Sequence, residues 1–242
     1  MSNSLWTEER AQRYIKLYGD PRKKMGTQSL LCRDASRMIT GESVLDFGCG
    51  MGHLIPYVPS LDRYVGLDYS EMMLTCLENF FPEARTIHGD VTLPYDSFKG
   101  TLEAAGVPTE FDTSISISLI IHLPRIQDIE ALLHNMWNTC TKAMVFGVET
   151  VGNVKQTRPD GLTLRNVSVK TIQGMLDKMG IGGEDEPEEL LYGRSSWVHQ
   201  KITLRQYITM YPLASQLSIE PKQELHTRTT LFRVEKPIID DQ

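Results

Sequence analysis

The chain has 242 residues and a mass of 27.5 kDa, which is long enough for one large domain with a full hydrophobic core. Hydrophobic residues make up 40% and charged residues 23%, which excludes a disordered chain, and no apolar run reaches the roughly 20 residues that span a bilayer. The net charge of −6 argues against a general nucleic-acid binder.

The four cysteines and the first twenty residues bear on the compartment. No pair of cysteines has C-x-x-C spacing, which argues against a zinc ribbon or a disulfide scaffold. The first twenty residues contain Glu8, Glu9, Arg10, Arg13 and Lys16, so they lack the apolar core of a signal peptide. We therefore expect a cytoplasmic protein with no membrane association.

Helical and strand patterns alternate over the first 150 residues. Periodicity and turn residues predict helices over 5–18 and 27–39, strands over 44–47, 63–68, 85–90, 111–121 and 143–149, and helices over 71–80 and 126–139, with another helix beginning near His53. After residue 150 the alternation breaks, and only a helix over 169–179 and a final strand over 226–235 are evident.

This alternation predicts an α/β domain whose parallel sheet is built from right-handed βαβ units. We expect a single domain over residues 1–242. Its parts are an N-terminal helical cap over 1–40, a core over 41–150, an insert over 151–225, and a final strand and tail over 226–242.

A glycine-rich turn with three acids carries the strongest functional signal. Asp46, Gly48, Gly50 and Gly52 alternate directly after an apolar strand, so the spacing is G-x-G-x-G and not the G-x-G-x-x-G of dinucleotide sites. Asp68 ends the next strand and Asp90 the one after it, both at the edge where an open sheet binds ligands. Acids at these positions suit a cationic or neutral nucleoside better than a pyrophosphate.

Four segments in this order resemble the class I S-adenosylmethionine-dependent methyltransferase family. They are VLDFGCGMG over 44–52, YVGLDYSEMM over 64–73, HGDVTLP over 88–94 and FDTSISISLIIHLP over 111–124. The resemblance implies a Rossmann-like three-layer sandwich with a mostly parallel seven-stranded sheet, the helical cap, and an insert after the fifth strand. It also implies S-adenosyl-L-methionine as cofactor and S-adenosyl-L-homocysteine as product.

The resemblance assigns Asp68 to the ribose hydroxyls, Asp90 to the adenine amine and Val91 to a backbone contact. The full set of expected cofactor-binding residues is Asp46, Gly48, Gly50, Asp68, Tyr69, Met73, Asp90, Val91 and Ser118. No metal-ligand cluster is visible in the sequence, and we expect no metal.

Residues expected on the acceptor side are less specific. His122, Glu149 and Tyr14 are candidates for catalysis, and Tyr18, Trp197 and His199 are candidates for substrate binding. The structural alternatives are a hydrogen-bonded histidine for His122, packing of an amphipathic helix for Tyr14 and Tyr18, and the core of the insert for Trp197 and His199.

The expected activity is in-line transfer of the sulfonium methyl group to O, N or C of a small-molecule acceptor. Because the chemistry needs alignment more than a base, an obvious catalytic residue is not required. Two alternatives remain: a methyltransferase acting on protein or RNA, or a non-catalytic protein with this fold. The glycine spacing disfavours a nicotinamide dehydrogenase. We expect no nucleic-acid partner and a monomer or homodimer.

Overall fold

The computed structural model describes residues 9, 12, 14, 20–23, 27–151, 167–181, 188–193, 201–203 and 226–237. For Thr27 and for residues 149–151, 188–193, 201–203 and 226–228 it describes the backbone alone.

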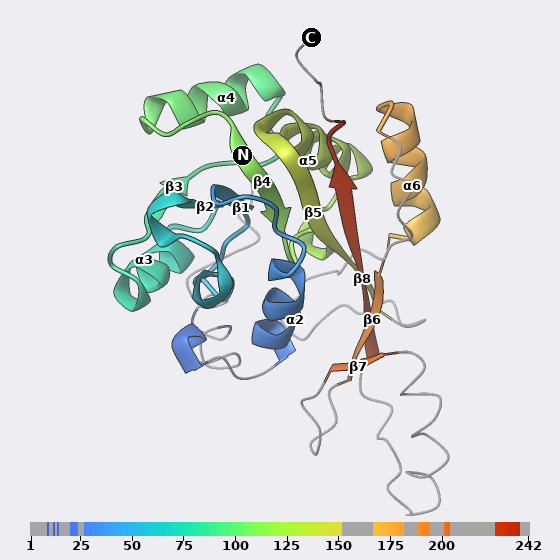
Figure 1. Ribbon diagram of the computed structural model, residues 1–242, viewed down its shortest axis with the longest axis horizontal. Coiled ribbons are helices and arrows are strands. Elements are labelled where there is room, and N and C mark those ends of the chain that lie inside the picture. The colour runs from blue at the N-terminus through green and yellow to red at the C-terminus, as the bar shows by residue number, and fades with distance from the viewer. Residues whose placement is uncertain are drawn as a thin grey trace, which may run out of the picture.

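One mixed sheet forms the centre of the protein (Figure 1). Its eight strands are β1 Val44–Phe47, β2 Tyr64–Asp68, β3 Arg85–His88, β4 Phe111–Ser116, β5 Cys140–Val151, β6 Glu188–Gly193, β7 Lys201–Thr203 and β8 His226–Glu235. They lie in the order β3-β2-β1-β4-β5-β8-β6-β7. The first five strands in the chain are parallel, and β8 runs antiparallel to both β5 and β6.

The Rossmann-like α/β fold is confirmed, with one correction to the strand count. The described residues contain eight strands where seven were expected, because the segment treated as an insert supplies both β6 and β7 to the main sheet. β6 pairs directly with the final strand β8, so part of this segment continues the sheet.

Helices flank the sheet. They are α2 Thr27–Ser36, α3 Glu71–Phe80, α4 Tyr95–Ala104, α5 Ile126–Thr139 and α6 Val169–Lys178. Four short 3-10 helices are also described, namely η1 Pro21–Lys23, η2 Ile55–Tyr57, η3 Leu61–Arg63 and η4 Ile120–His122. α3 begins where Ser70 accepts a hydrogen bond from the backbone of Met73, which satisfies one free amide of the first turn. Among the described residues, no helix combines the length and apolar character needed to cross a membrane.

Several predicted elements are confirmed and others are wrong. α3, α5 and β8 have the predicted bounds. The helix expected near His53 is replaced by turns and η2, since Pro56 and Pro59 remove backbone donors there. The strand expected over 111–121 ends at Ser116, and α4 was not predicted. Within the helix expected over 5–18, the three described residues, at positions 9, 12 and 14, are helical.

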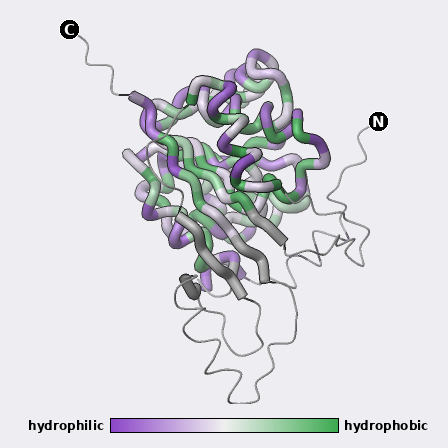
Figure 2. The backbone as a smooth tube through the Cα atoms, turned by 90° about the vertical axis from the view of Figure 1, so that its right-hand side faces the viewer, coloured by the Kyte–Doolittle hydropathy of each residue, from purple (hydrophilic) through white to green (hydrophobic). Residues whose placement is uncertain are grey.

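In β1, β2, β5 and β8, alternate residues enter two separate hydrophobic clusters, one on each face of the sheet. In β1, Leu45 and Phe47 pack with α4, α5 and α6, whereas Val44 packs with α2 and α3. Figure 2 shows that the strands at the centre of the protein consist largely of hydrophobic residues. Phe47 stacks on Phe98 of α4 at 5.3 Å between ring centroids, and each buried ring contributes about 1.5–3 kcal/mol to stability.

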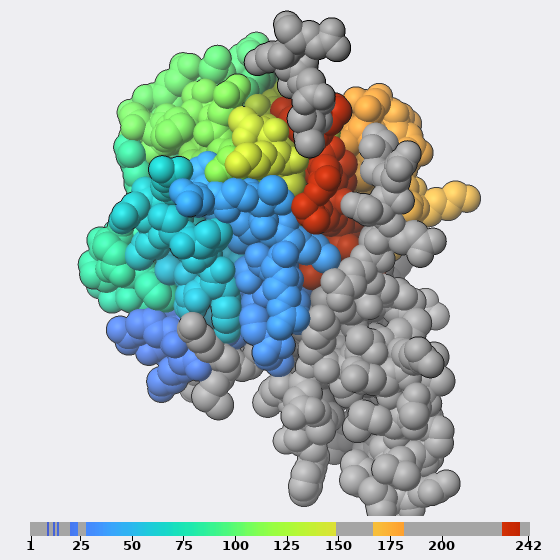
Figure 3. Space-filling view, viewed as in Figure 1, coloured from blue at the N-terminus to red at the C-terminus, as the bar shows by residue number. Residues whose placement is uncertain are grey.

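In Figure 3, residues of α2 cover the middle of the visible face, between the β2–α3 segment and β8.

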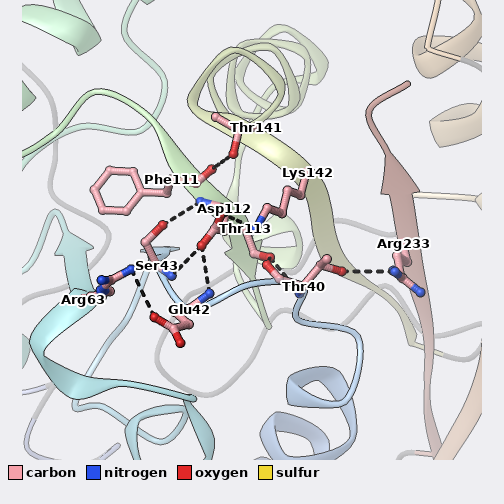
Figure 4. Close-up of polar contacts among 10 residues, drawn as sticks. All are labelled: Thr40, Glu42, Ser43, Arg63, Phe111, Asp112, Thr113, Thr141, Lys142 and Arg233. Carbon is pink, nitrogen blue, oxygen red and sulfur yellow. Dashed lines mark hydrogen bonds and ion pairs between the residues drawn. The ribbon is translucent and has the colours of Figure 1, made fainter. Parts of the chain in front are cut away.

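A polar network ties the amino ends of β1, β4 and β5 together, at the edge away from the glycine turn (Figure 4). The Asp112 carboxylate accepts hydrogen bonds from the backbone amides of Glu42 and Ser43 and forms an ion pair with Lys142 at 2.8 Å. Burial alone would raise the pKa of Asp112, but the hydrogen bonds from Lys142 and the two amides outweigh it and hold this pKa well below its usual range. The network therefore fixes the start of β1, the strand that leads into the glycine turn.

Candidate functional site

A pocket opens at the carboxyl ends of β1, β2 and β4, where the strand order reverses on either side of β1. This is the edge at which open α/β sheets bind ligands. About 580 Å³ of empty space lies between its walls, counting the open mouth. Its lining residues are Tyr14, Gln28, Cys32, Asp46, Gly48, Cys49, Gly50, Met51, His53, Leu54, Asp68, Met73, Ile117, Ser118, Leu119 and His122.

The glycine turn is anchored to the end of β2. The backbone amides of Gly48 and Cys49 both donate to the carbonyl of Leu67, at 2.7 and 3.0 Å. Gly48, Gly50 and Gly52 have φ of 75°, 53° and 86°, in the left-handed region that favours glycine.

The three glycines of the turn have different surroundings. A Cβ on Gly52 would lie 2.9 Å from the side chain of Ile55, so this glycine permits close packing. A Cβ on Gly50 would meet no atom within 4 Å. Gly50 therefore leaves open space beside the pocket.

Asp68 closes the turn from the opposite side. Its Oδ2 accepts from the amide of Gly50 and its Oδ1 from the amide of Ser70, both at 2.8 Å. Burial raises the pKa of Asp68, and the backbone donors oppose that rise. A carboxylate oxygen accepts more than one hydrogen bond, so Asp68 retains acceptor capacity for a ligand.

Asp46 lies beneath the turn and is only 4% exposed. Its Oδ2 accepts a hydrogen bond from the hydroxyl of Tyr64 at 2.9 Å. Burial raises the pKa of Asp46 to about 7; the Tyr64 hydrogen bond opposes this rise and the nearby Asp68 charge adds to it. The pocket thus contains two carboxylates, and its described lining includes no Lys or Arg.

The other wall comes from α2 and from the segment after β4. Ser118 has a φ of 59°, which is unusual for a residue other than glycine, and its hydroxyl donates to Oε1 of Gln28 at 3.2 Å. His122 ends η4 on the same wall, and Tyr14 also lines the pocket. Backbone strain of this kind clusters at ligand sites.

His53 was not predicted as a site residue. It follows Gly52 directly, which is the one sequence signal that could have found it. Its side chain is buried, and burial lowers its pKa to about 4, so the ring is neutral near pH 7. The other lining residues that the sequence did not identify are Gln28, Cys32, Cys49, Met51, Leu54, Ile117 and Leu119.

The structure brings eight of the predicted site residues into this pocket: Tyr14, Asp46, Gly48, Gly50, Asp68, Met73, Ser118 and His122. Three others lie outside its lining. Tyr69 is 39% exposed and contacts the ring of His88. Asp90 accepts from the amide and hydroxyl of Thr92, and the carbonyl of Val91 accepts from Asn135.

The remaining predicted residues are not placed. Tyr18, Trp197 and His199 lie outside the described residues, and Glu149 is described by its backbone in β5 alone. In the part of the chain that is described, no three His, Cys, Asp or Glu side chains gather to hold a metal ion.

Fold and site together define a class of protein. A sheet with parallel strands in the order β3-β2-β1-β4-β5, an antiparallel β8 and an acidic glycine turn at the strand ends is a Rossmann-like α/β domain. Residues 44–143 match the family model described as a methyltransferase domain. This range contains all four segments that resemble the class I S-adenosylmethionine-dependent methyltransferases.

One curated protein is similar to part of the chain. Residues of the chain are 30% identical, over 93 positions, to the ubiquinone biosynthesis O-methyltransferase of Paraburkholderia xenovorans (strain LB400). The match covers 38% of each protein, so the chain aligns with well under half the length of this curated relative.

Two solved structures show the same fold. The magnesium protoporphyrin IX methyltransferase of Synechocystis PCC 6803, solved with bound S-adenosylhomocysteine, has a TM-score of 0.58 and 15% identity, and the comparison covers 95% of each chain. A methyltransferase from Archaeoglobus fulgidus has a TM-score of 0.58 and 12% identity, over 93% of this chain and 99% of the other.

Proposed function

We propose that this protein binds S-adenosylmethionine in the pocket at the carboxyl ends of β1, β2 and β4. There it would transfer the sulfonium methyl group to O, N or C of a small-molecule acceptor by in-line substitution. The observation that carries the proposal is the pairing of Asp46 and Asp68 with the open glycine turn in one pocket.

The chemistry of the lining fits this cofactor. S-Adenosylmethionine carries positive charge on its sulfonium and ammonium groups, and two carboxylates without a lining Lys or Arg provide a favourable potential for a cation. The space at Gly50 allows the chain of a ligand to approach the backbone closely. Asp68, already fixed by two amides, has lone pairs left for the ribose hydroxyls.

When bound, the cofactor supplies an electrophilic methyl group. The residues of this chain would then orient the two reactants and exclude water. Asp68 holds the nucleoside, Asp46 stabilises the cationic end, and Met73 and Leu119 provide apolar walls. His122 and Tyr14 are the ionisable groups that we assign to the acceptor, where either could accept or relay its proton.

A small acceptor is supported by the net charge of −6. RNA methyltransferases usually carry a basic face. The acceptors named for the similar proteins differ chemically, including a porphyrin and a phosphoethanolamine, so they do not select one class for this chain. Methylation of protein or RNA is the second candidate.

We place the protein in the cytoplasm. The support is chemical: Cys32, Cys49, Cys76 and Cys140 form no disulfide bond, as expected in a reducing compartment.

The test is transfer of labelled methyl from S-adenosylmethionine to fractions of a cell extract separated into small molecules, protein and RNA. We expect label in the small-molecule fraction. Label confined to protein or RNA would contradict the acceptor class, and absence of label in all three, despite cofactor binding, would favour a non-catalytic role.

A further inference from the structure

Tyr64 is a buried residue beneath the pocket to which the proposed function assigns no role. Tyr64 begins β2 and is 1% exposed. In the parallel register of β1 and β2, Tyr64 lies opposite Val44, and Gly66 lies opposite Asp46. Tyr64 thus starts two residues below Asp46 on the same face of the sheet, and its phenol reaches up to Oδ2 of Asp46 at 2.9 Å.

Gly66 provides the space for this contact. A Cβ at Gly66 would lie 2.9 Å from both the hydroxyl of Tyr64 and the Sγ of Cys49, closer than real Cβ atoms approach. Only glycine at this position leaves room for the phenol between β2 and the glycine turn. Gly66 therefore leaves the hydroxyl the space that it needs beside the Asp46 carboxylate.

We propose that Tyr64 is a positioning residue of the cofactor site: its hydroxyl fixes the orientation and the ionised state of Asp46, and so sets the affinity for the cationic cofactor and the pH range in which it binds. The inference rests on the proposed function, because it concerns the same pocket.

The groups around Asp46 determine the direction in which the Tyr64 hydroxyl shifts the pKa of Asp46. Burial and the charge of Asp68 raise the pKa of Asp46, whereas the hydrogen bond from Tyr64 lowers it. The thiol of Cys49, whose pKa burial raises well above its ordinary value, stays neutral beside them. Within this group, Tyr64 is thus the side chain that stabilises the charged form of Asp46.

Binding of a cation beside Asp46 lowers its pKa below that of the free protein. Affinity for S-adenosylmethionine therefore rises with pH through the pKa of the bound form and levels off above that of the free protein, which is about 7. Removing the phenol hydroxyl raises the pKa of the free protein, so the plateau moves to higher pH.

The experiment compares Tyr64→Phe with wild type by calorimetric titration of S-adenosylmethionine and S-adenosylhomocysteine between pH 6 and pH 9. The matched control is Tyr57→Phe. Tyr57 packs against the same cluster and its hydroxyl bonds Ser29 at 2.7 Å, so this variant also loses one phenol hydrogen bond but does not touch Asp46.

We expect Tyr64→Phe to bind S-adenosylmethionine about tenfold more weakly at pH 7, with the pH midpoint raised by about one unit. The loss should be smaller for S-adenosylhomocysteine, which lacks the sulfonium charge, and it should shrink at pH 9. Tyr57→Phe should match wild type. Asp46→Asn, which keeps the shape of the side chain, should remove the pH dependence, and this holds as a test even if Tyr64→Phe does not fold.

If the wild type binds the cofactor and Tyr64→Phe has the same affinity and the same pH midpoint, the inference is overturned and the proposed function still stands. The same would follow from an equal loss at every pH, or from a pH dependence that persists in Asp46→Asn. Failure of the wild type to bind either ligand would overturn the proposed function itself.

Discussion

Replacing Gly50 by alanine separates ligand binding from folding at this site. Gly50 has a φ of 53°, and a Cβ there would meet no atom within 4 Å. The substitution therefore costs only the backbone strain of a left-handed alanine, about 1 kcal/mol, and adds no clash within the protein. For a chain of this length, that lowers the melting temperature by roughly 2–4 °C.

The effect on binding should be much larger. The added methyl group projects into open space at a residue that lines the pocket, where the proposed cofactor approaches the backbone. Overpacking of a well-fitted contact costs about 1–3 kcal/mol, so the dissociation constant for S-adenosylhomocysteine should rise by about tenfold or more.

Thermal unfolding and calorimetric titration of Gly50→Ala measure the two effects separately. A small drop in melting temperature with a large loss of affinity is the expected result. Wild-type affinity in the folded variant would show that no ligand approaches Gly50, and would refute the placement of the cofactor at this turn.

Three further substitutions test other parts of the structure. Gly52→Ala should affect stability more than binding, the reverse of Gly50→Ala. Because its Cβ would lie 2.9 Å from Ile55, it should destabilise the fold by about 2–4 kcal/mol in denaturant unfolding, while the folded protein keeps its ligand affinity to within a few-fold. A stable variant with lost affinity would contradict this. Asp68→Ala removes the proposed ribose acceptor and should weaken S-adenosylhomocysteine binding about 100-fold or more in the same titration, and unchanged affinity would refute the site assignment. Asp112→Asn should cost about 1–3 kcal/mol at pH 7. Since the folded protein lowers the pKa of Asp112, that stabilisation is present above the unfolded value near 4 and is lost as pH falls from there through the lower pKa of the folded protein. Urea unfolding should therefore show a smaller difference from wild type at pH 3 than at pH 7, and a difference that grows toward low pH would contradict the sign.

The sequence predicts those elements whose signals are local. α3 and α5 have clear apolar periodicity, and β8 is rich in β-branched residues, so their bounds are predicted correctly. α4 was missed because it follows Pro94, has no side-chain cap and contains Gly100. The strand expected to reach residue 121 ends at Ser116 because the chain turns at Ser118. Ser118 has a positive φ, which the conformational preferences of serine do not predict.

The candidate site divides in the same way. The glycine turn and its acids were predictable, because strand ends and glycine spacing are read directly from the chain. The contact between Tyr64 and Asp46 was not, since it depends on the register of β1 against β2 and on the space that Gly66 leaves. Gln28 and His53 enter the pocket through the packing of α2 and of the turn after Gly52, which no local pattern specifies.

Binding of the cofactor by the wild-type protein tests the account most directly. Calorimetric titration with S-adenosylmethionine, S-adenosylhomocysteine and NAD should give micromolar dissociation constants for the first two ligands and no binding of NAD. Binding of NAD, or of none of the three, would contradict the central claim that the acidic glycine-turn pocket holds S-adenosylmethionine.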